Sequence, residues 1–300
     1  MLTLRSTLLA AFVCGLAVAA QADSPQRIVA IGAAVSETVV ALGAAEALVA
    51  VDSGSRYPAL LQTLPQLGYH RALGAEGVLS MAPDRVITVA SAGPPVILRQ
   101  IEAAGVPVTR IEDPPDPHAV ADKIRSVGAA LGREAEAEAL AAAVAADIER
   151  ALQGGGGIPA RVLFLLNVSD GAPMAAGTDT AAQAMIEAAG ATNALSGFSG
   201  YRPLSLEAAL RANPDVILVM EQTLDRLGGV EELLTIPALR LTLAGRCRCV
   251  VAMEGTLLLG FGPRTAQAIS LLRDALGKSR EHGGAQVVST AVHVPGWSTP

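Results

Sequence analysis

The chain has 300 residues, of which 51% are apolar and 17% charged, and its formal net charge is −6. This composition excludes a disordered chain and leaves enough residues for one large domain or two ordinary ones. The acidic balance gives no basic surface for phosphates, and an aromatic content of 3% leaves few rings for stacking on bases. We therefore expect no nucleic-acid partner.

The first 22 residues have the pattern of a signal peptide. Arg5 precedes an apolar run from Leu8 to Ala20, and Ala20-Gln21-Ala22 is a small-x-small cleavage site. The apolar run is shorter than the ~20 residues that a membrane-spanning helix needs. We expect cleavage after Ala22 and export of the remaining chain.

Residues 23–131 alternate between strand and helix patterns. Short apolar runs predict strands, and longer runs with helical periodicity follow them. We expect strands at 28–31, 48–51, 86–89 and 106–111, and helices beginning near 36, 76 and 96. Alternation of this kind predicts an α/β lobe with a parallel sheet.

A helical tract without strands follows this lobe. Apolar residues recur at helical spacing from Val120 to Leu131, and Gly132 breaks the pattern. A second periodic segment then runs to Leu152, long enough for a helix of roughly 30 Å, and ends at a run of four glycines. We interpret residues 132–157 as a bridging helix with a glycine-rich turn.

The alternation restarts in residues 158–280. Strands are expected at 162–166, 216–219 and 249–252, with a helix after Thr178 and a closing helix at 265–276. Residues 281–300 lose the periodicity and are predicted to form a loose tail. The fold class predicted is therefore α/β, with two Rossmann-like lobes, mostly parallel sheets and one long connecting helix.

The mature chain keeps two cysteines, Cys247 and Cys249. Two residues apart on a strand, they would point to one face at a Cα separation near the upper limit for a disulfide. With no further Cys or His beside them they do not form a zinc site. We interpret them as strand residues without a chemical role.

One helix-strand pattern occurs twice. "AEGVLSMAPDRVI" has Glu76 seven residues before a proline, and "LEAALRANPDVIL" has Glu207 seven residues before another. A carboxylate in the first turn of a helix stabilises the free N–H groups there, which is one explanation. The other is a pair of exposed carboxylates, one on each lobe, matched to a two-fold symmetric partner.

The chain resembles the substrate-binding proteins of bacterial ABC importers with a single bridging helix, which carry cobalamin, ferric siderophores or haem. Within this class it is most similar to the periplasmic haem-binding proteins, over roughly Arg27 to Lys278. The segments that carry the resemblance are "VDSGSRYPALL", "LGYHRALGAEGVLSMAPD", "MAAGTDTAAQAMIEAAGATNAL", "GYRPLSLEAALRANPDVIL" and "LLLGFGPRTAQA".

The resemblance implies a function and partners. It implies a monomeric periplasmic protein that captures haem between its lobes and delivers it to a permease dimer coupled to ATPase subunits. By the same resemblance, Glu76 and Glu207 would dock onto arginines of the paired membrane subunits.

The resemblance also implies that Tyr57 is the iron ligand. Ferric iron is a hard acid, and a phenolate is a hard anionic donor. A neighbouring cation would help to hold the phenolate, and Arg56 is adjacent, while Arg202 or Arg226 would supply it from the second lobe. The alternative is a loop tyrosine with its hydroxyl in water.

Further residues of "RYP", "YHRAL" and the second lobe are candidates for a haem pocket. Arginine matches carboxylates with two donors at once, so the propionate candidates are Arg56, Arg71, Arg202 and Arg226, in loops or helix starts. Met174 would present an apolar side chain to the porphyrin, or else lies in the core. His70 is a candidate for axial ligand, propionate donor or plain surface residue. Some members of the family that the chain resembles bind a second haem through a histidine of the second lobe. The corresponding segment here, "NVSDGAPMAAG", is expected to be a loop and contains no histidine, so we expect one haem rather than two.

Two alternative functions differ in their sequence requirements. A dinucleotide enzyme would carry G-x-G-x-x-G and a serine hydrolase G-x-S-x-G, and neither pattern occurs, so we expect no catalysis. The second alternative is the same fold with a ferric siderophore or cobalamin as the ligand.

Overall fold

The computed structural model describes residues 26–154, 160–169 and 172–288. The expected cleavage site after Ala22 lies outside these residues. Within them, no helix combines the length and the apolar character needed to cross a membrane.

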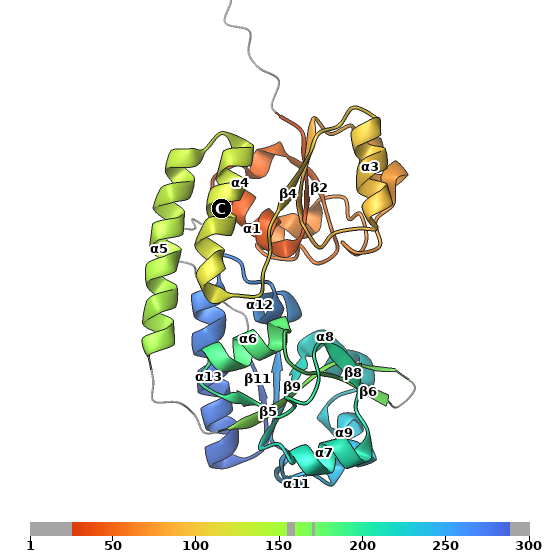
Figure 1. The fold of residues 1–300 in the computed structure, drawn as a ribbon, viewed down its shortest axis with the longest axis vertical. Coiled ribbons are helices and arrows are strands. Elements are labelled where there is room, and N and C mark those ends of the chain that lie inside the picture. The colour runs from red at the N-terminus through yellow and green to blue at the C-terminus, as the bar shows by residue number, and fades with distance from the viewer. Residues whose placement is uncertain (1–25, 155–159, 170–171, 289–300) are drawn as a thin grey trace, which may run out of the picture.

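The first lobe is built on a four-stranded parallel sheet. Its strand order is β2-β1-β3-β4, and all three strand pairs are parallel. Because helices cover both faces of the sheet, β1 is buried along its whole length (Figure 1). The elements are β1 (Ile28–Ile31), α1 (Ala33–Ala41), β2 (Leu48–Val51), α2 (Ala75–Ser80), β3 (Arg85–Val89), α3 (Pro95–Ala103), β4 (Val108–Ile111) and α4 (Val120–Leu131), with short 3₁₀ turns at Ala45–Ala47, Ala59–Thr63 and Pro117–Ala119.

The second lobe contains a mixed seven-stranded sheet. Its main path is β11-β10-β9-β5-β6-β8, with β7 paired to β5. The centre is parallel, while β6 is antiparallel to both of its neighbours, β5 and β8. The strands are β5 (Arg161–Ser169), β6 (Ala172–Ala176), β7 (Thr192–Asn193), β8 (Tyr201–Pro203), β9 (Val216–Met220), β10 (Val250–Met253) and β11 (Ala285–Val287).

Helices pack on both sides of this second sheet. In Figure 1, α6 and α13 lie on one side, and α7, α9 and α11 lie on the other. The helices are α6 (Ala181–Ala188), α7 (Leu206–Ala212), α8 (Glu221–Leu227), α9 (Val230–Leu233), α10 (Pro237–Arg240), α11 (Leu243–Cys247), α12 (Gly255–Leu259) and α13 (Thr265–His282). The predicted α/β class with two lobes and mostly parallel sheets is confirmed.

The longest helix, α5 (Glu134–Gln153), leads from the first lobe to the second and packs against α4 and α13 (Figure 1). Gly132 ends α4 in the left-handed conformation, with φ 68°, as the break in the sequence pattern suggested. Glu134 and Glu136 lie in the first turn of α5, where the helix dipole favours acidic residues.

Three sequence predictions differ from the structure. The expected tail from residue 281 is wrong for its first part, because α13 continues to His282 and β11 pairs in parallel with β10. Residues 289–300 lie outside the described part. "NVSDGAPMAAG" is largely two antiparallel strands, β5 and β6, rather than a loop.

The third difference concerns the cysteines. Cys247 is the last residue of α11 and Cys249 precedes β10, so the two do not share a strand. The turn between them brings their Cα atoms to 5.2 Å, and they form a disulfide. Arg248 makes this turn in the left-handed conformation, with φ 61°, which a strand pattern cannot predict.

Candidate functional site

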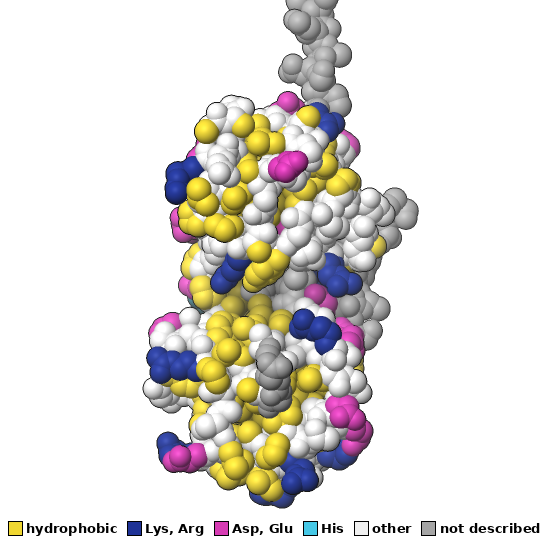
Figure 2. Space-filling view, turned by 90° about the vertical axis from the view of Figure 1, so that its right-hand side faces the viewer, with side chains coloured by type: hydrophobic (Ala, Val, Ile, Leu, Met, Phe, Trp, Pro, Cys, Tyr) yellow, Lys and Arg dark blue, Asp and Glu magenta, His cyan; other side chains and the backbone are white. Residues whose placement is uncertain are grey.

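The candidate site lies where the two lobes face each other. Strands β2 and β3 of the first lobe end at this level, and the loop after β2 carries Tyr57, His70 and Arg71. In parallel α/β sheets, ligands bind at the carboxyl ends of the strands. Figure 2 shows a hollow between the lobes, with apolar side chains in it and Lys or Arg side chains around it. The waist of the molecule thus combines apolar surface with positive charge.

Tyr57 is partly exposed at this waist. Arg264, which precedes α13 in the second lobe, places its guanidinium carbon 3.9 Å from the centroid of the Tyr57 ring. Burial raises the pKa of the Tyr57 hydroxyl, the charge of Arg264 opposes this rise, and Glu37 adds to it. Tyr57 is therefore a neutral phenol in the absence of a metal, with a cation already beside it.

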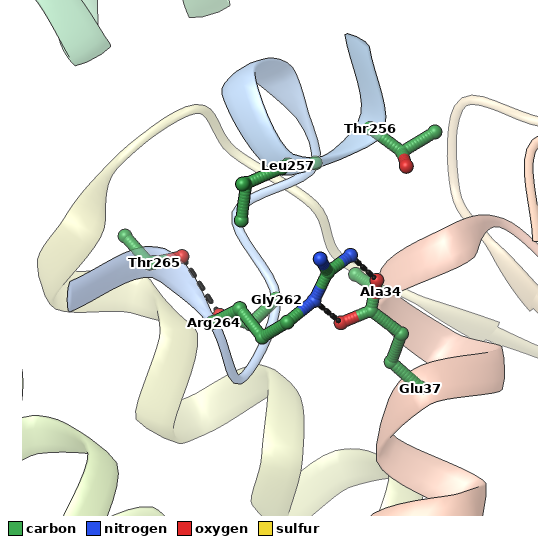
Figure 3. A pocket seen from close by; sticks show the side chains of 8 residues that line it. Ala34, Glu37, Thr256, Leu257, Gly262, Arg264 and Thr265 are labelled. Carbon is green, nitrogen blue, oxygen red and sulfur yellow. Dashed lines mark hydrogen bonds and ion pairs between the residues drawn. The ribbon is translucent and has the colours of Figure 1, made fainter. Parts of the chain in front are cut away.

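Arg264 is held by Glu37 of α1, in the other lobe. The Arg264 Nε donates to Glu37 Oε2 at 2.9 Å, and a second guanidinium nitrogen donates to Glu37 Oε1 (Figure 3). Both side chains are nearly fully buried, with 3% of Arg264 and 4% of Glu37 exposed. Burial acts to lower the pKa of Arg264, but the hydrogen bonds and charge of Glu37 outweigh it and raise that pKa. Arg264 therefore stays a cation inside the protein.

The segment that carries Arg264 fits closely against the first lobe. Lys123 of α4 is buried and donates from its Nζ to the Phe261 carbonyl at 3.0 Å. A Cβ on Gly262 would lie 3.2 Å from the Ala34 Cα, so only glycine fits here without displacing α1. Burial lowers the pKa of Lys123 to about 8, against the charge of Asp113.

His70 lies in the same region with both ring nitrogens engaged. Its Nδ1 is 3.8 Å from Asp52 Oδ2, and its Nε2 accepts from Arg71 Nε at 3.3 Å. Burial lowers the pKa of His70, while the charge of Asp52 opposes this. The imidazole is therefore neutral at neutral pH, and it would have to leave Arg71 before its Nε2 could bind a metal.

The buried Asp52 fixes this part of the loop. Its carboxylate accepts from the backbone N–H of Gly32 at 2.8 Å and from the Ser55 hydroxyl at 2.6 Å. These bonds tie the end of β2, and the loop that leads to Tyr57, to the turn after β1.

The other candidates lie on several elements of the two lobes. Arg56 and Arg71 are exposed, and Arg202 lies with its guanidinium carbon 5.2 Å from the Phe198 ring centroid. Arg202 lies in strand β8, and Arg226 lies in the last turn of α8, so the expectation of loops or helix starts is wrong for these two. Met174 is partly buried in β6, the strand next to β8.

Tyr201 of β8 lies within range of the charge of Arg71 in the first lobe. Burial raises the pKa of its hydroxyl, and a backbone hydrogen bond at Ala182 and the charge of Arg71 oppose the rise. Arg71 therefore lies close enough to act on a residue across the waist.

Glu76 and Glu207 are both exposed in the first turns of α2 and α7. The α7 start is capped by the Ser205 side chain, which accepts from the Ala208 N–H, and not by Glu207. The Glu207 side chain is 80% exposed and pairs with Arg211 one turn along the helix. The repeated glutamates therefore present their carboxylates to solvent, one on each lobe.

Sequence reasoning missed the buried ion pair between Arg264 and Glu37. Arg264 lies in "LLLGFGPRTAQA", where a charged residue follows an apolar run. This position was the one local indication in the segment that the arginine is buried. Glu37 falls at the expected start of the first helix, near residue 36, and nothing in the local pattern marks it as a partner of Arg264. Their pairing joins positions 227 residues apart, which no local pattern reports.

Comparisons with known proteins agree with this arrangement. A family model described as "Periplasmic binding protein" matches residues 28–256. The solved periplasmic heme-binding protein RhuT from Roseiflexus sp. RS-1 is 44% identical, with a TM-score of 0.82 over 86% of this chain and 100% of that chain. The periplasmic heme-binding protein BhuT, solved in complex with two hemes, is 41% identical, with a TM-score of 0.81 over 85% of this chain and 99% of that one. A cobalamin-binding protein of Halobacterium salinarum is 27% identical over 84% of this chain and 70% of its own length.

Proposed function

Since this chain belongs to the periplasmic binding protein family, we propose that it captures haem between its two lobes and delivers it to an ABC importer. The observation that carries the proposal is Tyr57 with the Arg264 guanidinium over its ring. A phenolate suits ferric iron, and the adjacent cation stabilises the anionic form of the ligand. The similarity to RhuT and BhuT supports the same cargo.

The groups around Tyr57 suit the rest of a haem. In this proposal the exposed guanidinium groups of Arg56, Arg71, Arg202 and Arg226 are the candidates for binding the two propionates. Met174 offers a soft apolar side chain to the porphyrin face. The apolar and basic surface around the waist is consistent with a flat apolar ligand that carries two carboxylates (Figure 2).

His70 is a second candidate ligand in this proposal. Its low pKa leaves a neutral nitrogen donor, but the bond from Arg71 occupies Nε2. We therefore assign Tyr57 the main role and propose that His70 orients Arg71.

One haem per protein remains our prediction. It rests on the lack of histidine in the segment from Asn167 to Gly177. BhuT was solved with two hemes, so the number bound is a separate question from the identity of the ligand.

Delivery requires a docking surface for the importer. We propose that Glu76 and Glu207, exposed on separate lobes, engage basic sites of a permease dimer that works with ATPase subunits. The protein would act as a monomer in the periplasm after removal of residues 1–22. Its role in this proposal is binding and transfer rather than catalysis.

Cobalamin or a ferric siderophore is the alternative cargo. The Halobacterium relative is described as cobalamin-binding. Tyr57 beside Arg264 favours haem, because cobalamin brings its own cobalt ligands and a catecholate siderophore fills the iron shell itself.

The test is an absorbance titration of the mature protein with ferric haem, cyanocobalamin and a ferric catecholate siderophore in parallel. We expect saturation by haem at one equivalent and no saturable change with the other two. Saturable binding of cobalamin or the siderophore, without haem binding, would overturn the proposal and retain the fold.

A further inference from the structure

We propose that Glu37 is a positioning residue that holds Arg264 over the Tyr57 ring only while the lobes are closed. Parting the lobes would then withdraw the cation from the iron ligand and promote release. This inference rests on the proposed function, since it describes how the same site lets its cargo go.

The three side chains come from both lobes. Tyr57 and Glu37 belong to the first lobe, and Arg264 reaches them from the second. Two guanidinium nitrogens donate to the two carboxylate oxygens of Glu37, which fixes the plane of the guanidinium as well as its position. The guanidinium carbon lies 3.9 Å from the Tyr57 ring centroid.

Burial makes Glu37 necessary for this placement. Arg264 is 4% exposed as a residue, so little water compensates its charge. A buried cation without its partner is strongly unfavourable, and the side chain would turn toward solvent if Glu37 were neutral. The cation over Tyr57 therefore depends on Glu37.

The placement also depends on the distance between the lobes. Residues 260–264 reach the first lobe through the bond from Lys123 to the Phe261 carbonyl and the close approach of Gly262 to Ala34. These contacts and the ion pair join the same two lobes, so an opening motion breaks them together. The small cavity lined by Glu37, Arg264 and Thr256 would open at the same time (Figure 3).

Parting the lobes would weaken the bond between the Tyr57 phenolate and the haem iron. With Arg264 withdrawn, the phenolate loses its nearest positive charge in a partly buried place, and its bond to iron weakens. On release the iron–oxygen bond breaks, the electron pair stays on the phenolate oxygen, and that oxygen takes a proton from water. The haem leaves with its iron in the ferric state.

The test compares Glu37→Gln with Lys123→Met in the mature protein. Glu37→Gln keeps the shape of the side chain and one acceptor but removes the charge that holds Arg264. Lys123→Met removes a different hydrogen bond between the lobes, to the Phe261 carbonyl, and leaves Tyr57, Glu37 and Arg264 unchanged. The pair of variants therefore separates a loss of the cation from a loss of interlobe contact in general.

Two measurements on the ferric haem complex decide the outcome. We expect Glu37→Gln to shift the phenolate-to-iron charge-transfer band and to speed haem loss to excess apomyoglobin by about tenfold, as expected for losing a desolvated cation–π contact. Lys123→Met should leave the band in place. An unchanged band and a rate within about twofold in Glu37→Gln, or an equal band shift in Lys123→Met, would overturn the inference.

A third measurement needs no haem. The chain has three tyrosines, so ¹³C-labelled tyrosine ring signals are few and Tyr57→Phe assigns that of Tyr57. Glu37→Gln should move the Tyr57 signal, and Lys123→Met should not. If the wild-type protein binds no haem but the Tyr57 signal behaves as stated, the proposed function fails while the positioning of Arg264 by Glu37 stands.

Discussion

At the scale of single residues, two buried cations occupy the contact between the lobes, and their surroundings differ. Arg264 has a full carboxylate partner in Glu37, whereas Lys123 is 3% exposed and donates to the Phe261 carbonyl, a neutral acceptor. A carbonyl compensates a buried charge less well than a carboxylate does. This explains why the pKa of Lys123 falls to about 8 while that of Arg264 rises.

The lowered pKa of Lys123 predicts a pH dependence of stability. Between about pH 8 and 10.5 the unfolded chain holds a proton on Lys123 that the folded chain has lost. The free energy of unfolding should therefore rise with pH in this window, by up to about 3 kcal/mol. Urea unfolding of the wild type and of Lys123→Met across this pH window checks this. The difference between their free energies of unfolding cancels the contributions of the other titrating groups. A difference that stays flat with pH would contradict the prediction.

Residue types at the site could be predicted from the sequence, but their partners could not. Tyr57, Glu76 and Glu207 lie in segments that resemble those of the haem-binding proteins, so each could be identified on its own. The cation that contacts the Tyr57 ring is Arg264, and its position depends on two lobes meeting. Local spacing favoured Arg56, which is adjacent in sequence and exposed in the structure.

At the scale of the elements, the contact between α4 and α5 sets the geometry of the connection between the lobes. A Cβ on Gly128 of α4 would lie 2.1 Å from the Ala137 Cβ of α5, so the two helices approach more closely than any other residue would allow. Helix pairs at this separation need a residue without a side chain at the crossing.

Gly128→Ala should therefore destabilise the protein. We expect a loss of about 1–3 kcal/mol, since the added methyl group forces the two helices apart. The free energy of unfolding from urea titration measures it. Gly277→Ala in α13 is a matched control, because a Cβ there meets nothing within 4 Å. Equal stability of Gly128→Ala and the control would show that the helices can separate without loss.

The disulfide gives a second prediction at this scale. Cys247 and Cys249 are two residues apart, and a loop this short restricts the unfolded chain only slightly. Reduction should lower the free energy of unfolding by about 1–2 kcal/mol. Unfolding with and without a thiol reductant measures this, and the double Cys→Ser variant, which should not respond, is the control. A loss of more than about 4 kcal/mol would show that the disulfide holds the end of α11 and β10 in place.

The elements themselves were largely predictable, with understandable exceptions. The strands at Ile28–Ile31 and Leu48–Val51 are short β-branched runs buried on both faces, and such runs report strands directly. Strand β11 was missed because it lies at the sheet edge, with Ala285 and Val287 exposed, and shows no apolar run. The turn at Arg248 was missed because its left-handed conformation is unusual for an arginine.

At the scale of the whole molecule, each lobe carries one of the two repeated exposed glutamates, Glu76 and Glu207, and the lobes meet around a buried ion pair. In the proposed function the importer would contact these carboxylates rather than Tyr57, and the Glu207 side chain is 80% exposed. A partner that engages both glutamates would act on the separation of the lobes, and hence on the contact between Arg264 and Tyr57.

Reversing the charge of both glutamates should impair haem transport and leave haem binding intact. Glu76→Lys with Glu207→Lys should reduce transporter-dependent haem uptake at least about tenfold, because like charges would then face the basic sites of the permease. Haem affinity should stay within about twofold of the wild type, and uptake into permease-containing vesicles measures transport. Glu134→Lys with Glu136→Lys, at exposed positions on α5, is the control of equal charge. Uptake that survives the first pair of changes would contradict the docking assignment.

We propose that Tyr57 binds the iron of a haem held between the lobes. The visible spectrum of the ferric haem complex tests this, measured for the mature protein beside Tyr57→Phe and the control Tyr69→Phe, which changes a tyrosine that is 54% exposed. We predict a phenolate-to-iron charge-transfer band in the wild type and in Tyr69→Phe, and its loss in Tyr57→Phe. A band that persists in Tyr57→Phe, or a wild-type complex without one, would show that Tyr57 is not the iron ligand.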